Sequence, residues 1–193
     1  MQAIFLDTET TGTDPSMHRI LEIAFKLIDL PSGTEKLTYQ AIVKQSMDVW
    51  KKRDPVSVEI NGFTWEKTQQ GKDEAVVSQE IMKIFDDYHV ERNKAVYICQ
   101  NPAFDRSFFG QLVSFHLQEQ KKWPYHWLDL ASMYWALEIE ACRRDKRAFP
   151  KELPISKNAI AKRYQLSSES EPHEALNGVD HLILCYRAVV GFD

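Results

Sequence analysis

The spacing of apolar residues near the start of the chain predicts three strands. Residues 3–6 form a short unbroken apolar run, which is typical of a strand buried on both faces. Apolar and polar residues alternate over residues 21–27 and again over residues 37–43, with a Pro-Ser-Gly turn at 31–33 between them. Two runs of period two around such a turn predict an antiparallel hairpin.

The remainder of the chain alternates between helical and strand patterns. Val77, Ile81, Ile84 and Tyr88 follow the spacing of one helix face, and Ser156 is a candidate N-cap. Three strands followed by alternating helices and strands predict a mixed-sheet α/β fold in a single domain over residues 1–193. We expect further helices at 104–115, 130–141, 156–164 and 174–190, and strands at 95–99 and 127–128.

Composition excludes several classes of protein. The chain is 44% hydrophobic and 11% aromatic with a net charge of −4, as in ordinary globular proteins. Cys99, Cys142 and Cys185 are widely spaced and form no CxxC pair, which argues against a disulfide scaffold or a structural zinc site. With no apolar run of about 20 residues and no secretory signal pattern, we expect a cytoplasmic protein without membrane contact.

Residues 143–163 depart from the mean charge, because they contain eight basic and two acidic residues in a chain of net charge −4. A basic segment suits a polyanion, since phosphate contacts supply most of the sequence-independent affinity for nucleic acid. A solvated loop and helix face explains the same composition equally well.

Two carboxylates follow the first apolar run. Asp7 and Glu9 are two residues apart, so strand geometry places both side chains on one face. They repel each other unless a positive charge lies between them, and a hard divalent cation would serve. Two exposed acids in a turn are the alternative. The next residues, Thr10, Thr11 and Gly12, form a turn whose N–H groups could meet a nucleotide.

Two further acids and a histidine are candidates for the same site. Asp105 follows the strand at 95–99 at the start of a helix, where it could also simply compensate helix charge. Asp180 lies among apolar helical neighbours, and a carboxylate there is costly unless paired or bound to a metal. His173 precedes the same helix and is either a helix-end residue or a proton acceptor.

Three segments resemble the motifs of DEDDh-type 3′-5′ exonucleases, which are DnaQ-like members of the ribonuclease H-like superfamily. They are Asp-Thr-Glu-Thr-Thr-Gly at 7–12, Asn-Pro-Ala-Phe-Asp at 101–105, and His-Glu-Ala at 173–175 with Asp180 after it. Residues 58–64 and 158–164 are similar to two other family segments. The resemblance implies a mixed five-stranded sheet, with the first three strands antiparallel and the others parallel, flanked by helices.

The resemblance also implies a mechanism. Asp7, Glu9, Asp105 and Asp180 would hold two Mg²⁺ or Mn²⁺ ions, and His173 would take a proton from the attacking water. The enzyme would release 5′-mononucleotides from the 3′ end of single-stranded DNA or RNA, and a polymerase or a second copy of the chain stays open as a partner. We expect substrate contacts from Thr10, Thr11, Gly12, Ile60, Asn61, Phe63, Asn101 and Phe104, although Phe63 could equally belong to the core.

One position departs from the family pattern. The histidine usually precedes the last aspartate by five positions, but Gly178 stands there and Asp180 follows two residues later. Two helical residues amount to a rotation of about 200°. Either a longer loop after His173 lets Asp180 enter the site, or His173 is displaced. We give more weight to Asp180 than to His173, and His181 is a weaker substitute base. A catalytically impaired nucleic-acid- or polymerase-binding module and a phosphoesterase for small nucleotides are therefore the alternatives to an exonuclease.

Overall fold

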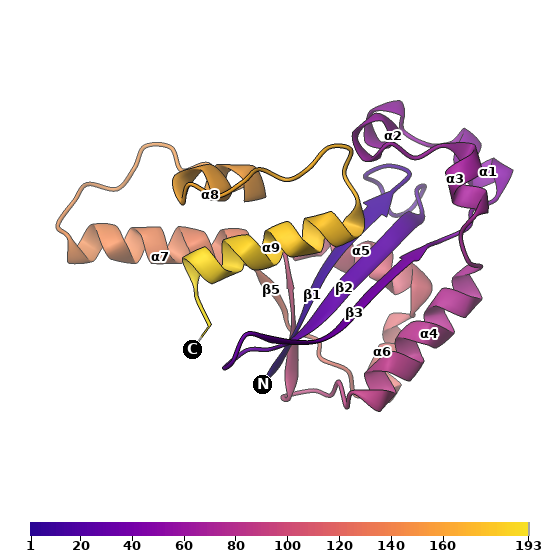
Figure 1. Ribbon diagram of the computed structural model, residues 1–193, viewed down its shortest axis with the longest axis horizontal. Coiled ribbons are helices and arrows are strands. Elements are labelled where there is room, and N and C mark those ends of the chain that lie inside the picture. Colours follow the sequence, from indigo (N-terminus) through magenta and orange to yellow (C-terminus); the bar gives the residue numbers. More distant parts are fainter. Residues whose placement is uncertain (193) are drawn as a thin grey trace.

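A five-stranded sheet in the order β3-β2-β1-β4-β5 organises the molecule. The computed structural model describes residues 1–192 (Figure 1). β1 pairs antiparallel with β2, and β2 with β3, whereas β1–β4 and β4–β5 are parallel. This confirms the predicted mixed α/β sheet and its strand directions. The strands are β1 Gln2–Thr10, β2 Ile20–Asp29, β3 Thr34–Ile42, β4 Ala95–Cys99 and β5 Trp127–Asp129.

Helices cover both faces of this sheet. The long helices confirm the predicted periodicities, and Ser156 caps α8 by accepting a hydrogen bond from the Ala159 N–H. The stripe at 104–115 is two helices, because Val113 is extended and Ser114 caps a new helix. The helices are α1 Met47–Lys51, α2 Pro55–Asn61, α3 Trp65–Gln69, α4 Glu74–Asp87, α5 Pro102–Leu112, α6 Phe115–Gln120, α7 Leu130–Arg144, α8 Lys157–Arg163 and α9 Ala175–Val189.

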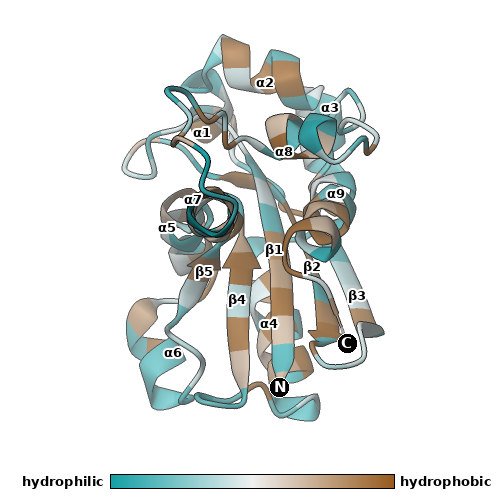
Figure 2. Ribbon diagram, turned by 90° about the vertical axis from the view of Figure 1, so that its left-hand side faces the viewer, coloured by the Kyte–Doolittle hydropathy of each residue, from teal (hydrophilic) through white to brown (hydrophobic). Residues whose placement is uncertain are grey.

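The central strand β1 is buried on both sides, as its apolar run predicts. Ile4 and Leu6 pack into the core with α4 and α5, while Ala3 and Phe5 pack against α7 and α9. Figure 2 shows the mostly hydrophobic residues of β1 and β4 between these helices. Each fully buried large side chain contributes about 1.5–3 kcal/mol to stability. This burial fixes the position of β1 and therefore of the polar residues at its carboxyl end.

Three short helices, α1 to α3, lie together beyond one end of the sheet (Figure 1). Leu21, Trp50 and Phe63 form a small separate core beneath them. Helices of five to seven residues complete too few turns to show an apolar stripe, and their helical structure was not predicted.

The three cysteines are buried free thiols. Within residues 1–192, no helix is both long enough and apolar enough to cross a bilayer.

Candidate active site

The carboxyl ends of β1 and β4 meet at one edge of the sheet, and a pocket of about 240 Å³ opens there. Asp7 and Glu9 reach it from the end of β1, and Asp105 from the first turn of α5, which follows β4. His173 reaches it from the segment before α9. The structure thus brings together four of the five predicted catalytic side chains. The other lining residues are Thr8, Thr10, Thr13, Ser57, Ile60, Asn61, Gln100, Phe104, Lys157 and Glu169.

The three acids of the pocket are held in conditions that oppose their ionisation. Burial raises the pKa of Glu9 to about 8, with a further contribution from the charge of Asp7. Burial and the charge of Asp7 raise the pKa of Asp105 well above its usual range. The pKa of Asp7 is also raised, because burial and Glu169 outweigh the opposite effect of Lys157. Mutual repulsion of this kind is relieved by a cation.

The segment that carries Asp105 is fixed at both of its ends. Asp105 Oδ1 accepts a hydrogen bond of 2.9 Å from Thr8 Oγ1, which joins α5 to β1. Asn101 adopts a left-handed conformation, with φ of 57°, that lets α5 begin at Pro102. Its N–H donates to Asp129 Oδ1, while its exposed side chain does not line the pocket.

Several of the predicted substrate contacts lie in the pocket wall. Thr10, Ile60, Asn61 and Phe104 line it, and Asn61 Nδ2 donates to the Thr10 carbonyl at 3.1 Å. This bond ties α2 to the end of β1. Ile60 is half exposed, which leaves an apolar side chain free at the pocket mouth.

Three other residues that were predicted to contact the substrate make contacts within the protein instead. Phe63 is only 4% exposed in the core with Leu21 and Trp50, so its ring is not free to stack on a base. Thr11 Oγ1 accepts a hydrogen bond from the Arg19 N–H, and Gly12 packs closely against the ring of His18. Neither Thr11 nor Gly12 lines the pocket.

Close packing between α2 and the segment before α9 positions His173. Gly62 ends α2 with φ of 64°, and a Cβ there would come 2.9 Å from Pro172 Cβ. The His173 N–H donates to the Ile60 carbonyl at 3.1 Å. The imidazole and Ile60 therefore occupy the same pocket wall.

Asp180 does not reach this pocket, contrary to the prediction that it completes the acidic cluster. Its Oδ1 lies 2.6 Å from Lys26 Nζ, and its side chain is 52% exposed. α9 begins after His173 without the longer loop that would turn Asp180 inward, and Gly178 takes the inward position. The structure thus places His173 in the pocket, and it places Gly178 rather than Asp180 on the side of α9 that faces Asp7.

Two charged residues of the pocket were missed. Lys157 Nζ lies 3.2 Å from Asp7 Oδ1 and 3.0 Å from Glu169 Oε1, and its side chain is only 13% exposed. Glu169 also faces His181, with Oε2 3.7 Å from Nδ1. Hydrogen bonding to His181, together with the charge of Lys157, lowers the pKa of Glu169 to about 2, against the effect of its burial. Lys157 belongs to the basic segment at 143–163, whose excess of positive charge was the available signal, whereas no sequence pattern marks Glu169.

The residues present suit a divalent cation by their chemistry. Asp7, Glu9 and Asp105 offer the hard oxygen ligands that Mg²⁺ and Mn²⁺ prefer. Four carboxylates face one ammonium in the pocket, an excess of three negative charges when all are ionised. As they stand, no three acidic, histidine or cysteine side chains of residues 1–192 are arranged as a metal site, so the acids would have to turn toward a bound ion.

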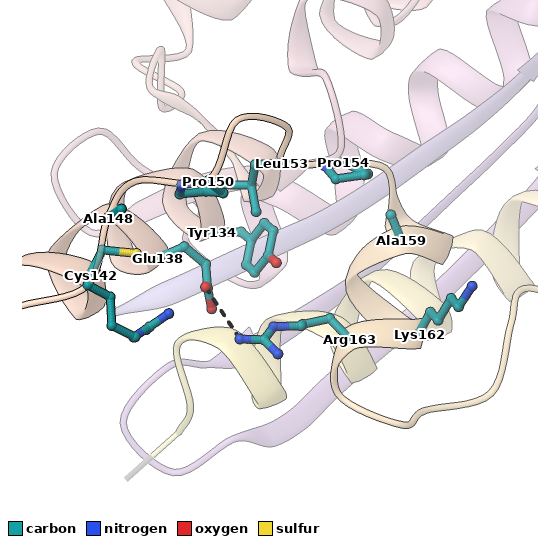
Figure 3. A pocket seen from close by; sticks show the side chains of 11 residues that line it. Tyr134, Glu138, Cys142, Ala148, Pro150, Leu153, Pro154, Ala159, Lys162 and Arg163 are labelled. Carbon is teal, nitrogen blue, oxygen red and sulfur yellow. Dashed lines mark ion pairs between the residues drawn. The ribbon is translucent and has the colours of Figure 1, made fainter. Parts of the chain in front are cut away.

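The basic segment at 143–163 lies mainly on the surface, apart from Lys157. Together with Tyr134 and other residues of α7, it forms a second pocket of about 570 Å³ between α7 and α8 (Figure 3). Arg163 there pairs with Glu138 at 3.6 Å. This pocket contains none of the predicted catalytic residues.

Comparison with known proteins supports the assignment of the fold. The exonuclease model RNase_T matches residues 4–182. An E. coli exonuclease I complex with a dA16 oligonucleotide superposes with a TM-score of 0.73 at 18% identity, covering 98% of this chain and 41% of that one. The zinc-bound E. coli exonuclease I complex with single-stranded DNA gives a TM-score of 0.76 at 20% identity, covering 97% of this chain and 40% of that one.

This chain thus spans about two fifths of the length of these exonuclease I chains. No curated protein sequence gives a significant match. The family model covers most of the chain. The chain therefore belongs to the exonuclease family, as a DEDDh-type, DnaQ-like member with the ribonuclease H-like fold.

Proposed function

We propose that this protein is a metal-dependent 3′-5′ exonuclease that removes 5′-mononucleotides from single-stranded DNA or RNA. The convergence of Asp7, Glu9, Asp105 and His173 on one pocket carries the proposal. These groups come from β1, α5 and the segment before α9, which are distant in the chain. An acid cluster with an adjacent histidine suits hydrolysis of a phosphodiester.

Asp7, Glu9 and Asp105 would hold the divalent cation. Such an ion would supply Lewis acidity at the phosphate and would lower the pKa of a bound water. His173 would accept the proton of the attacking water. The oxygen of that water forms the new bond to phosphorus, the bond to the 3′ oxygen of the shortened strand breaks, and the released nucleotide keeps the 5′ phosphate.

The pocket wall offers contacts for one terminal nucleotide. Ile60 and Phe104 present apolar surface, while the Thr10 hydroxyl and the Asn61 amide are committed to holding the wall together. We expect this pocket of about 240 Å³ to take the terminal nucleotide of the strand. The similarity to exonuclease I solved with DNA oligonucleotides supports a single strand as the substrate.

The test is shortening of DNA and RNA strands labelled at the 5′ end, with Mg²⁺, Mn²⁺ or chelator. We expect metal-dependent ladders that shorten from the 3′ end, with 5′-mononucleotide as the product. Asp105→Asn is the matched inactive control. Intact strands under every metal condition would contradict the proposal, and cleavage restricted to short nucleotides would instead favour a small-nucleotide phosphoesterase.

A second candidate, a binding module with impaired catalysis, is favoured by Gly178, which leaves the site without the family's fourth acid. Such a module would bind a labelled strand but not shorten it with either metal. Binding measured by fluorescence anisotropy beside the shortening assay separates the two functions.

A further inference from the structure

Lys157 holds a fixed positive charge beside Asp7. Its ammonium nitrogen lies within reach of Asp7 Oδ1, Glu169 Oε1 and the Gly178 carbonyl oxygen, at 3.2, 3.0 and 3.5 Å. An ammonium group has three N–H donors, so these three oxygens can use all of them. Because the side chain is largely buried at the first position of a capped helix, its charge is held in place.

These three partners are also the ligand types of a hard divalent cation. Two carboxylates and one backbone carbonyl are typical oxygen ligands of such ions. The ammonium of Lys157 therefore occupies a position that a metal ion could fill if the lysine were absent.

Gly178 makes this arrangement possible. A Cβ at this position would lie 2.7 Å from Asp7 Cγ and 3.1 Å from Glu169 Oε1. Any side chain there would push Asp7 out of its contact with Lys157. The glycine at 178 and the contact of Lys157 with Asp7 are thus two parts of one arrangement.

The charges favour one divalent ion over two. With Lys157 in place, one divalent ion would reduce the excess of three negative charges in the pocket to one. A second divalent ion would make the net charge of the pocket positive, and the ammonium of Lys157 would repel this ion.

We propose that Lys157 is a resident cation that replaces a second divalent metal ion on the Gly178 side of Asp7. The site then binds one divalent ion, through Asp7, Glu9 and Asp105, and uses the ammonium as its second positive charge. This inference rests on the proposed exonuclease function, in which the ammonium offsets negative charge on the phosphate during hydrolysis.

Counting bound Mn²⁺ tests the proposal without turnover. Free Mn²⁺ is measured by electron paramagnetic resonance during titration of the full chain, with and without thymidine 5′-monophosphate. We expect one ion per wild-type chain in both cases. In Lys157→Met, which keeps the volume of the stem and frees the three oxygens, we expect two ions.

Two further variants locate the second ion. Lys157→Met combined with Glu169→Gln should return the count to one, because it removes one of the freed carboxylates. Lys162→Met, which removes an exposed lysine from the same helix, should leave the count at one. Circular dichroism checks that each variant is folded.

Two ions per wild-type chain would overturn the proposal, and so would a count of one in folded Lys157→Met. The wild-type count decides the matter even if Lys157→Met does not fold. Failure of the exonuclease function is a different result, namely one Mn²⁺ bound by the wild type and no strand shortened.

The rate of strand shortening gives a readout that a merely structural lysine would not change. In Lys157→Met we expect at least about a tenfold fall in kcat at low Mn²⁺, with recovery as the second ion binds at high Mn²⁺. A fall that no Mn²⁺ concentration reverses would contradict the replacement of an ion by the ammonium.

Discussion

Asp180 Oδ1 lies 2.6 Å from Lys26 Nζ, in an ion pair that joins α9 to β2 on the outside of the sheet. Gly178, two positions earlier, faces Asp7 instead. The two positions differ by about 200° around the helix, so one face of α9 packs against the pocket and the opposite face carries the surface ion pair.

We therefore expect Asp180→Asn to cleave strands within about twofold of the wild-type rate, because the carboxylate is remote from the pocket. Its exposed ion pair contributes less than about 1 kcal/mol to the free energy of unfolding. Asp105→Asn should lose at least about 100-fold in rate and remain folded. Strand shortening and urea unfolding measure both effects. A 100-fold loss in Asp180→Asn would show that this residue enters the site during catalysis.

The pKa of Glu9, raised to about 8, predicts a pH dependence of stability when metal is removed by chelator. The folded state keeps this proton at pH values where the unfolded chain has lost it. The free energy of unfolding should therefore fall as pH rises from 4.5 to about 8, by an amount on the order of a few kcal/mol. Urea unfolding at several pH values measures this slope.

Glu9→Gln should remove a large part of that slope, whereas the exposed Glu59→Gln should not change it. Some slope should persist in Glu9→Gln, because the raised pKa values of Asp7 and Asp105 act in the same direction. Equal slopes for the wild type and Glu9→Gln would refute the assignment.

Metal binding should stabilise the protein more in alkaline than in acidic solution. The ion needs ionised carboxylates, whereas Glu9 and Asp105 hold their protons to unusually high pH. We expect the rise in Tm caused by Mg²⁺ to be larger at about pH 8.5 than at about pH 6. Thermal unfolding with Mg²⁺ or chelator at both pH values measures the difference, and Asp7→Asn should show little rise at either.

Loss of the imidazole should slow the chemical step without weakening strand binding. His173 lines the pocket beside the three acids, and a positioned base typically contributes about 10²–10⁴-fold to the rate. We expect a loss of this size for His173→Gln in single-turnover strand shortening. The affinity for a labelled strand should change little, and His116→Gln on the exposed surface of α6 is the control. A loss confined to affinity would remove His173 from the role of base.

Replacing two apolar residues near the pocket with alanine should affect different properties, namely stability for one and KM for the other. Phe63→Ala should cost about 3–5 kcal/mol of unfolding free energy, because the ring is buried against Leu21 and Trp50. Ile60→Ala removes a side chain that is 50% exposed at the pocket mouth. It should raise KM for the strand and change stability by less than about 1 kcal/mol. Urea unfolding measures the stability of both variants, and steady-state kinetics measures their KM. An unchanged stability of Phe63→Ala would place the Phe63 ring outside the core.

The long strands and helices could be predicted from the sequence, because their apolar positions recur several times with the period of a strand or of a helix. The convergence of Asp7 with Asp105 could be expected as well, since each follows an apolar strand and such strands end at a common edge. The short helices α1 to α3 could not be predicted, because their helical structure depends on caps such as Ser46 and on tertiary packing.

The remaining part of the site depends on contacts that no local pattern encodes. Lys157 lies 150 positions from Asp7, within a basic segment whose composition fits a polyanion-binding surface and a solvated surface equally well. Glu169 belongs to a polar loop of serines and acids, and its burial follows from Lys157 and His181. Asp180 was misplaced because apolar neighbours on α9 suggest burial, while the ion pair with Lys26 depends on where β2 lies.

The buried thiol of Cys99 has a consequence for chemical labelling. It stands at the end of β4, and burial together with the nearby charges of Asp105 and Asp7 raises its pKa well above the usual range. Alkylating reagents attack the thiolate, so they should reach this sulfur only after β4 separates from its neighbours. The rate of Cys99 alkylation therefore reports how often the centre of the sheet opens, from a position beside the acids themselves.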